Sequence, residues 1–171
     1  MPTRTPVRKE TELDDAARAR ILELLTRGYA MEIETVANYL ANSIHLDGML
    51  AMEVKESLEE DVTEELNHAK MLAGRIKILG GKIPGSLSLT MSQKGLQPPE
   101  STIDIESVIR GVIDAEDAAI SNYQELIEAT GDDRDPVTQD LAVELKGDEE
   151  EHRRQFVGFL REYEAMKRMF K

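Results

Sequence analysis

The sequence predicts an all-α protein, a four-helix bundle with one long crossover between helices two and three. Two observations lead to this prediction. The six prolines lie at positions 2, 6, 84, 98, 99 and 136, so that long stretches of the chain contain no helix breaker. Aromatic residues make up only 4% of the 171 residues, and β-branched residues do not alternate with polar ones as they would in a strand. The sequence therefore does not predict a sheet.

The four predicted helices follow from these stretches. The first covers about residues 13–45 and ends at the turn LDGM, and the second covers about 49–79 and stops at two glycines. The third begins near Asp104, a suitable N-cap, and ends at TGDDRDP. The fourth covers about 136–171. We therefore expect a flexible tail over residues 1–12 and one bundle over residues 13–171.

The connections between these helices are short, long and short. The long one, KIPGSLSLTMSQKGLQPPEST, has enough residues to cross the full length of a bundle, whereas short connections join antiparallel neighbours. The sequence thus predicts two helical hairpins joined by a crossover.

Composition limits the classes of function. The 34 acidic residues exceed the 21 basic ones and give a net charge of −13, which argues against general nucleic-acid affinity despite the basic stretch TRTPVRK near the N-terminus. The chain has no cysteine, which excludes disulfides, thiolate zinc sites and iron–sulfur clusters. No signal peptide or apolar membrane span is visible, so we expect a cytoplasmic protein without membrane contact.

Each helix has an apolar face, here called its seam, that is interrupted at one place by Glu or by Glu and His. In the first and third helices the interruption is a single Glu, and in the second and fourth it is the motif Glu-x-x-His. The six residues concerned are Glu32, Glu65, His68, Glu116, Glu149 and His152.

The spacing of these residues repeats. From Glu32 to Glu65 is 33 residues, and from Glu116 to Glu149 is also 33. A tyrosine, Tyr39 or Tyr123, follows the first Glu of each pair by seven residues. The chain therefore predicts two hairpins of one design about a pseudo-twofold axis.

Four carboxylates in the core of a bundle are prohibitively costly as bare charges. Two divalent cations would cancel them, and residues at positions i and i+3 of a helix can reach one metal region. Four Glu and two His form the di-iron or di-manganese set described for ferritin-like bundles. Oxygen and imidazole ligands suit iron or manganese better than structural zinc.

Several residues admit other interpretations. Glu34 competes with Glu32, but the two lie about 200° apart on a helix, and only Glu32 lies on the apolar stripe; substitution of Glu34 is expected to be mild. Tyr39 and Tyr123 are expected to be core aromatics, with a hydrogen-bonding or electron-transfer role left open. His45 is expected to be solvated or capping, and methionines such as Met49, Met52 and Met71 to fill the core.

With these residues placed, the chain resembles the bacterioferritin branch of the ferritin superfamily, including its Dps-like relatives, over roughly residues 18–165. The motifs that carry the resemblance are EIETVANYL, EELNHAKMLAGRIKILGGKIP and LKGDEEEHRRQF. It implies that Glu65 and Glu149 bridge two irons, with Glu32 and His68 completing one and Glu116 and His152 the other. It also implies a ferroxidase that oxidises Fe(II) with O2 or H2O2 and stores ferric mineral in a hollow homo-oligomer.

Three departures from that family qualify the resemblance. Leu66 stands where haem-binding bacterioferritins carry Met, so haem is not expected. The crossover is longer than in that group, and no break follows the fourth helix to allow a fifth. These last two features favour a dodecamer of about 230 kDa, twelve times the subunit mass of 19.2 kDa, over a 24-mer. The alternative function is a non-storage di-iron or di-manganese oxidoreductase, peroxide-reducing or oxygenase-type, of the same fold.

Overall fold

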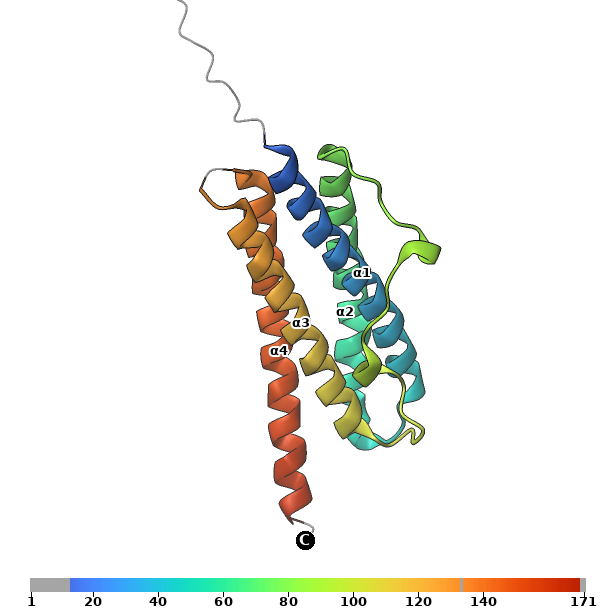
Figure 1. The fold of residues 1–171 in the computed structure, drawn as a ribbon. Coiled ribbons are helices and arrows are strands. Elements are labelled where there is room, and N and C mark those ends of the chain that lie inside the picture. The colour runs from blue at the N-terminus through green and yellow to red at the C-terminus, as the bar shows by residue number, and fades with distance from the viewer. Residues whose placement is uncertain (1–12, 133, 170–171) are drawn as a thin grey trace, which may run out of the picture.

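Four long helices lie side by side in the computed structural model, which describes residues 13–132 and 134–169 (Figure 1). They are α1 (Asp15–His45), α2 (Met52–Ile78), α3 (Ile105–Thr130) and α4 (Pro136–Met169). No strand occurs in the part of the chain that is described. The predicted all-α bundle with one long crossover is confirmed, whereas the predicted tail at residues 1–12 lies outside the described residues.

Side chains cap the N-termini of α1 and α3, and the cap at Asp104 is the one that the sequence predicts. Asp14 caps α1 by accepting a hydrogen bond from the Ala17 backbone N–H at 2.8 Å, and Asp104 caps α3 through Ser107 N–H at 3.2 Å. The predicted start of the second helix is wrong by three residues. Residues 49–51 form a 3₁₀ turn, entered through Gly48 at φ 99°, and α2 begins only at Met52.

The apolar core is divided into two clusters. One cluster, around Tyr39, Leu58 and Phe156, fills the end of the bundle where α1 passes into α2. The other, around Leu25 and Leu126, fills the opposite end. The six acidic and histidine residues of the seams lie between the clusters, so that two apolar ends enclose a polar middle layer.

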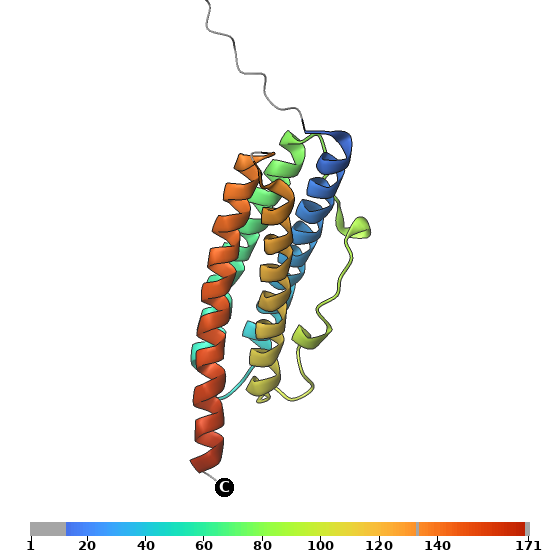
Figure 2. The ribbon, with the colours of Figure 1, turned by 60° about the vertical axis from the view of Figure 1, so that its left-hand side comes forward.

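The crossover runs along the outside of α1 and α3, as the two views in Figures 1 and 2 show. It contains two 3₁₀ turns, Ser86–Ser88 and Lys94–Leu96, and no α-helix. Asn42 of α1 donates a hydrogen bond to the Leu96 carbonyl at 2.8 Å. Because α3 has Gly111 at the point of contact, the backbone of the crossover can lie directly against that helix.

Replacing Gly111 with Ala should lower the free energy of unfolding by about 2 kcal/mol, because the added Cβ would meet crossover backbone that packing cannot easily move. A Cβ added there would overlap the Gly95 carbonyl oxygen and would lie 2.9 Å from the Leu96 Cα atom. Gly147→Ala in α4 is the matched control: its Cβ meets nothing within 4 Å, so it should stabilise the helix by up to about 1 kcal/mol. Urea unfolding measures both. Equal stability of the two variants would contradict this packing.

Candidate metal centre

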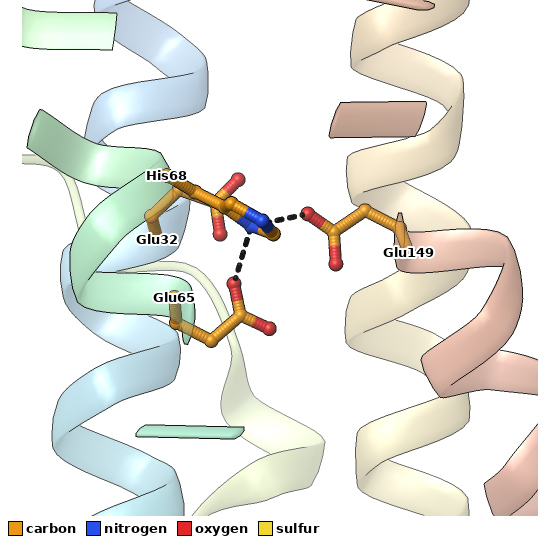
Figure 3. Close-up of side chains that lie close together, drawn as sticks. All are labelled: Glu32, Glu65, His68 and Glu149. Atoms are coloured by element: carbon orange, nitrogen blue, oxygen red, sulfur yellow. Dashed lines mark ion pairs between the residues drawn. The ribbon is translucent and has the colours of Figure 1, made fainter. Parts of the chain in front are cut away.

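The six residues singled out by the seams converge in the middle layer of the bundle. Their ligand atoms form two groups, in each of which the atoms lie within 4.8 Å of one another. The first group is Glu32, Glu65, His68 and Glu149 (Figure 3), and the second is Glu65, Glu116, Glu149 and His152. All six side chains are buried. The two groups share Glu65 and Glu149, which come from α2 and α4.

Both imidazoles direct the same nitrogen at the shared carboxylates. The Nδ1 atom of His68 lies 3.3 Å from Glu65 and 3.1 Å from Glu149 (Figure 3). The Nδ1 atom of His152 lies 3.3 Å from Glu65 and 3.2 Å from Glu149. The two rings lie nearly parallel, with centroids 6.3 Å apart. This arrangement places two nitrogen donors on either side of a shared pair of carboxylates.

The two tyrosines of the repeat bind the outer carboxylates crosswise. Tyr39 of α1 donates a hydrogen bond to Glu116 of α3, and Tyr123 of α3 donates one to Glu32 of α1. Both tyrosines are fully buried, and burial together with the adjacent carboxylate raises the pKa of each well above its ordinary value. Each hydroxyl therefore stays protonated and holds one carboxylate in a fixed orientation.

The second nitrogen of each imidazole faces a carboxylate that the sequence reasoning missed. The Nε2 atom of His68 lies 3.3 Å from Asp148, and that of His152 lies 3.3 Å from Glu64. Each of these acids directly precedes the Glu of the opposite Glu-x-x-His motif. A carboxylate on the far nitrogen fixes the tautomer of a metal-binding imidazole and raises its basicity. The acid before each motif was the signal available in the sequence.

The electrostatics of the layer show how poorly it tolerates its own charges. Burial, and then the charges of Glu65 and Glu149, raise the pKa of Glu32 and of Glu116 well above the ordinary value. Burial alone would lower the pKa of His68, but contacts with Glu149 and Glu65 raise it to about 10. The same causes raise the pKa of His152 to about 12. In the absence of a metal, bound protons supply the positive charge that the carboxylates require.

Several buried atoms of the layer have no hydrogen-bond partner: Glu65 Oε1, Glu65 Oε2, Glu149 Oε1 and His68 Nδ1. Such orphaned acceptors are costly in a core and are rare in native proteins. Three of these atoms belong to Glu65 and Glu149, the side chains shared by both groups, and the fourth belongs to His68 of the first group. Carboxylate and imidazole donors at this number and spacing fit two divalent cations of the iron or manganese type.

Glu34 lies on the opposite side of α1 from the cluster, as the helical geometry predicts. It is nevertheless buried, at 5% exposure, because the crossover covers it. Its carboxylate accepts hydrogen bonds from the backbone N–H groups of Ser92, at 2.7 Å, and Gln93, at 2.8 Å. The expectation that a change at Glu34 would have a mild effect on Fe(II) oxidation stays a prediction. Because this residue anchors the crossover, its loss should nevertheless cost stability.

Other expectations fall outside the cluster. The Nε2 atom of His45 lies 2.7 Å from the Pro99 carbonyl oxygen, at the end of the crossover, and the ring is only partly buried. The prediction that methionines fill the core is wrong for Met49 and Met52, which are 88% and 58% exposed. Met71 packs against the second apolar cluster as expected.

Comparison with known proteins agrees with this geometry. Residues 22–166 match the family model of the ferritin-like domain. The DNA protection during starvation protein of Pyrococcus furiosus is 32% identical over 137 residues, which cover 78% of this chain and 72% of that protein. Bacterioferritin of Desulfovibrio desulfuricans is 26% identical over 135 residues, covering 79% of this chain and 71% of that protein.

Solved structures give the same fold. A dodecameric thioferritin, the bacterioferritin-related protein from Bacteroides fragilis, has a TM-score of 0.76 at 24% identity, over 90% of this chain and 91% of that one. The Desulfovibrio desulfuricans bacterioferritin, solved with its diiron site in different catalytic states, has a TM-score of 0.73 at 21% identity, over 91% of this chain and 86% of that one.

Binding of divalent metal should release protons and weaken as the pH falls. Contacts with the shared carboxylates raise the pKa of His68 to about 10 and that of His152 to about 12, so both imidazoles carry an additional proton near neutral pH in the metal-free protein. The raised pKa values of the Glu32 and Glu116 carboxyls act in the same direction. The number of protons that a metal displaces therefore includes one from each imidazole. Calorimetry with Co(II) in buffers of different ionisation enthalpy measures this number. Binding that is independent of buffer and of pH would contradict the protonation scheme.

Proposed function

Because this chain belongs to the ferritin-like family, we propose that it oxidises Fe(II) at a dinuclear centre and stores the ferric product inside a hollow homo-oligomer. The observation that carries this proposal is the buried layer of four carboxylates and two imidazoles, in which both oxygens of Glu65 and one of Glu149 have no hydrogen-bond partner. Such a layer requires cations, and the family handles iron.

The roles of the six residues follow from the two groups. Glu32 and His68 would serve one metal position, and Glu116 and His152 the other. Glu65 and Glu149 belong to both groups and would bridge them. We therefore propose two iron ions for each subunit, with manganese as the alternative metal, because oxygen and imidazole ligands accept either.

The surrounding residues prepare the site for oxidation. An iron pair supplies two electrons to an oxidant such as O2 or H2O2 when it is bound. The four carboxylates balance the positive charge, and the gain of charge on oxidation makes their field more favourable. Tyr39 and Tyr123 keep the outer carboxylates oriented toward the layer. The apolar clusters on either side exclude water and so strengthen these interactions.

The charge of the chain favours iron handling over contact with DNA. Both curated relatives cover most of the bundle, and one of them is a bacterioferritin. The net charge of −13 opposes contact with a phosphate backbone. Among the described residues no helix has the length and apolar character needed to cross a membrane.

An exposed apolar patch supports assembly into a larger particle. The patch lies around the turn between α1 and α2. At this turn the Asp47 N–H donates a hydrogen bond to the Thr102 carbonyl, which holds the start of α3 next to the turn. Its members are between 50% and 88% exposed: Leu40, Ile44, Met49, Leu50, Met52 and Ile103. Apolar groups gathered in this way mark protein interfaces. With a dodecamer among the similar structures, we propose a dodecamer here.

Substitution of Glu32 by Gln should lower the initial rate of Fe(II) oxidation by more than roughly tenfold, the loss that even an outer partner of a metal ligand can cause. Glu34→Gln is the matched control. It makes the same chemical change on the opposite side of α1, where the side chain contacts the crossover and not the cluster, so the oxidation rate should change little. Stopped-flow absorbance of ferric product measures both rates. A slower Glu34→Gln enzyme beside an unaffected Glu32→Gln enzyme would reverse the assignment of the first-helix ligand.

Iron loading under air separates storage from the alternative oxidoreductase. A storage protein takes up far more than two irons for each subunit, whereas an oxidoreductase of the same fold stops near two. Uptake that ends near two would leave the dinuclear centre in place but would refute storage.

Ile44→Glu combined with Met52→Glu should dissociate the assembly, because like charges would replace apolar contacts between subunits. Sedimentation should show the mass fall from about 230 kDa, twelve subunits of 19.2 kDa, toward smaller species. Val143→Glu is the control, an exposed apolar residue of α4 outside the patch, and it should leave the mass unchanged. A wild-type mass near that of two subunits would refute the cage.

A further inference from the structure

The two halves of the centre are related by a constant shift along the chain. Glu32 and Glu116 are 84 residues apart, as are Glu65 and Glu149, since 116 − 32 and 149 − 65 both equal 84. The same shift relates the two histidines, the two tyrosines, and the two acids that face the histidine Nε2 atoms. The immediate surroundings of the two metal positions are therefore nearly equivalent.

The equivalence fails at one buried position beside a histidine. Asp61 of α2 is 7% exposed, and its Oδ1 atom lies 3.8 Å from the Nε2 atom of His152. The same shift from residue 61 leads to residue 145, which is Leu145, a fully buried member of the second apolar cluster. A buried carboxylate therefore lies beside His152 where the equivalent position on the other side is a hydrocarbon side chain. Glu64, which is exposed, lies near both histidines and does not distinguish them.

The surroundings of Asp61 do not explain it as a packing residue. The nearest hydrogen-bond donor to its carboxylate, apart from the histidine, is the Ser57 hydroxyl at 3.4 Å, which is a long contact. A cavity of about 260 Å³ adjoins His152 and is lined by Asp61 and by four further acids, Glu60, Glu64, Asp148 and Glu151. Burial of a carboxylate among other carboxylates costs stability unless a cation is nearby.

We propose that Asp61 makes the two metal positions unequal, so that the position formed by Glu116 and His152 binds a divalent cation first and more tightly. This inference rests on the proposed dinuclear centre and names how that centre is filled. The carboxylate acts in two ways. It adds negative charge near the cation, and its charge 3.8 Å from the Nε2 atom of His152 adds to that of Glu64, which lies 3.3 Å from the same nitrogen and orients the ring.

The expected difference is about tenfold in dissociation constant, at the lower end of the effect that outer partners of metal-binding histidines have on affinity. Asp61 is therefore a positioning residue, since it acts on the cation through His152 and through its charge. A purely structural role would alter the stability of the helix pair and leave the relative affinities of the two positions unchanged.

Anaerobic Co(II) titration of the full chain, followed calorimetrically, tests the order. Wild type should bind two ions in two steps that differ about tenfold in affinity. His68→Ala should retain the tighter step, because its remaining position has Asp61 beside it. His152→Ala should retain only the weaker one. Adding Asp61→Leu, which copies Leu145, should weaken binding to His68→Ala about tenfold and leave binding to His152→Ala unchanged.

Two further variants protect this test. Asp61→Asn removes the charge at constant size and should reproduce the effect of Asp61→Leu, so a folding defect caused by leucine cannot imitate the result. Glu60→Gln removes a charge from the same cavity at an exposed residue and should leave both steps unchanged. Helicity and unfolding midpoints of all variants report their folding.

The outcomes separate the inference from the function on which it rests. Two Co(II) ions bound with equal affinity, or an Asp61 effect of the same size in both single-histidine backgrounds, would overturn the order of filling and leave the dinuclear centre intact. A wild-type chain that binds no Co(II) pair would overturn the centre and the proposed function together.

Discussion

Burial of four carboxylates in the middle of a bundle is the constraint on which the rest of this structure depends. Glu65 and Glu149 carry oxygens without hydrogen-bond partners, and nothing in the apolar layers above and below can neutralise them. The cost of burying these charges is therefore offset only when cations or protons bind to the carboxylates. This accounts for the raised pKa values of both outer carboxyls and both imidazoles in the metal-free chain.

The remaining parts of the fold maintain this costly layer. The two apolar clusters supply the burial that stabilises the bundle at each end. Contacts between the hairpins connect them in both directions. Each tyrosine holds a carboxylate of the other hairpin, and Glu64 and Asp148 each face a histidine of the other hairpin. Displacement of one hairpin would disturb both groups of the cluster, so the rigidity of the cluster is a property of the whole bundle.

The crossover has a separate structural basis. Glu34 binds two backbone N–H groups of the crossover on the outer side of α1, and Gly111 allows it to approach α3. Two buried glutamates two residues apart on α1 thus do different work, one facing the cluster and one fastening a loop. The difference arises from the direction in which each faces and from what covers it.

The sequence by itself determined the helices, the crossover and the six residues of the cluster, because a repeat of Glu and Glu-x-x-His on apolar seams has few physical solutions. It did not determine which side chains meet between helices. The burial of Glu34, the crossed contacts of Tyr39 and Tyr123, and the place of Asp61 beside His152 depend on how the hairpins pack. Periodicity assigns a residue to a face of its own helix, but only the tertiary structure brings an opposing helix or loop to that face.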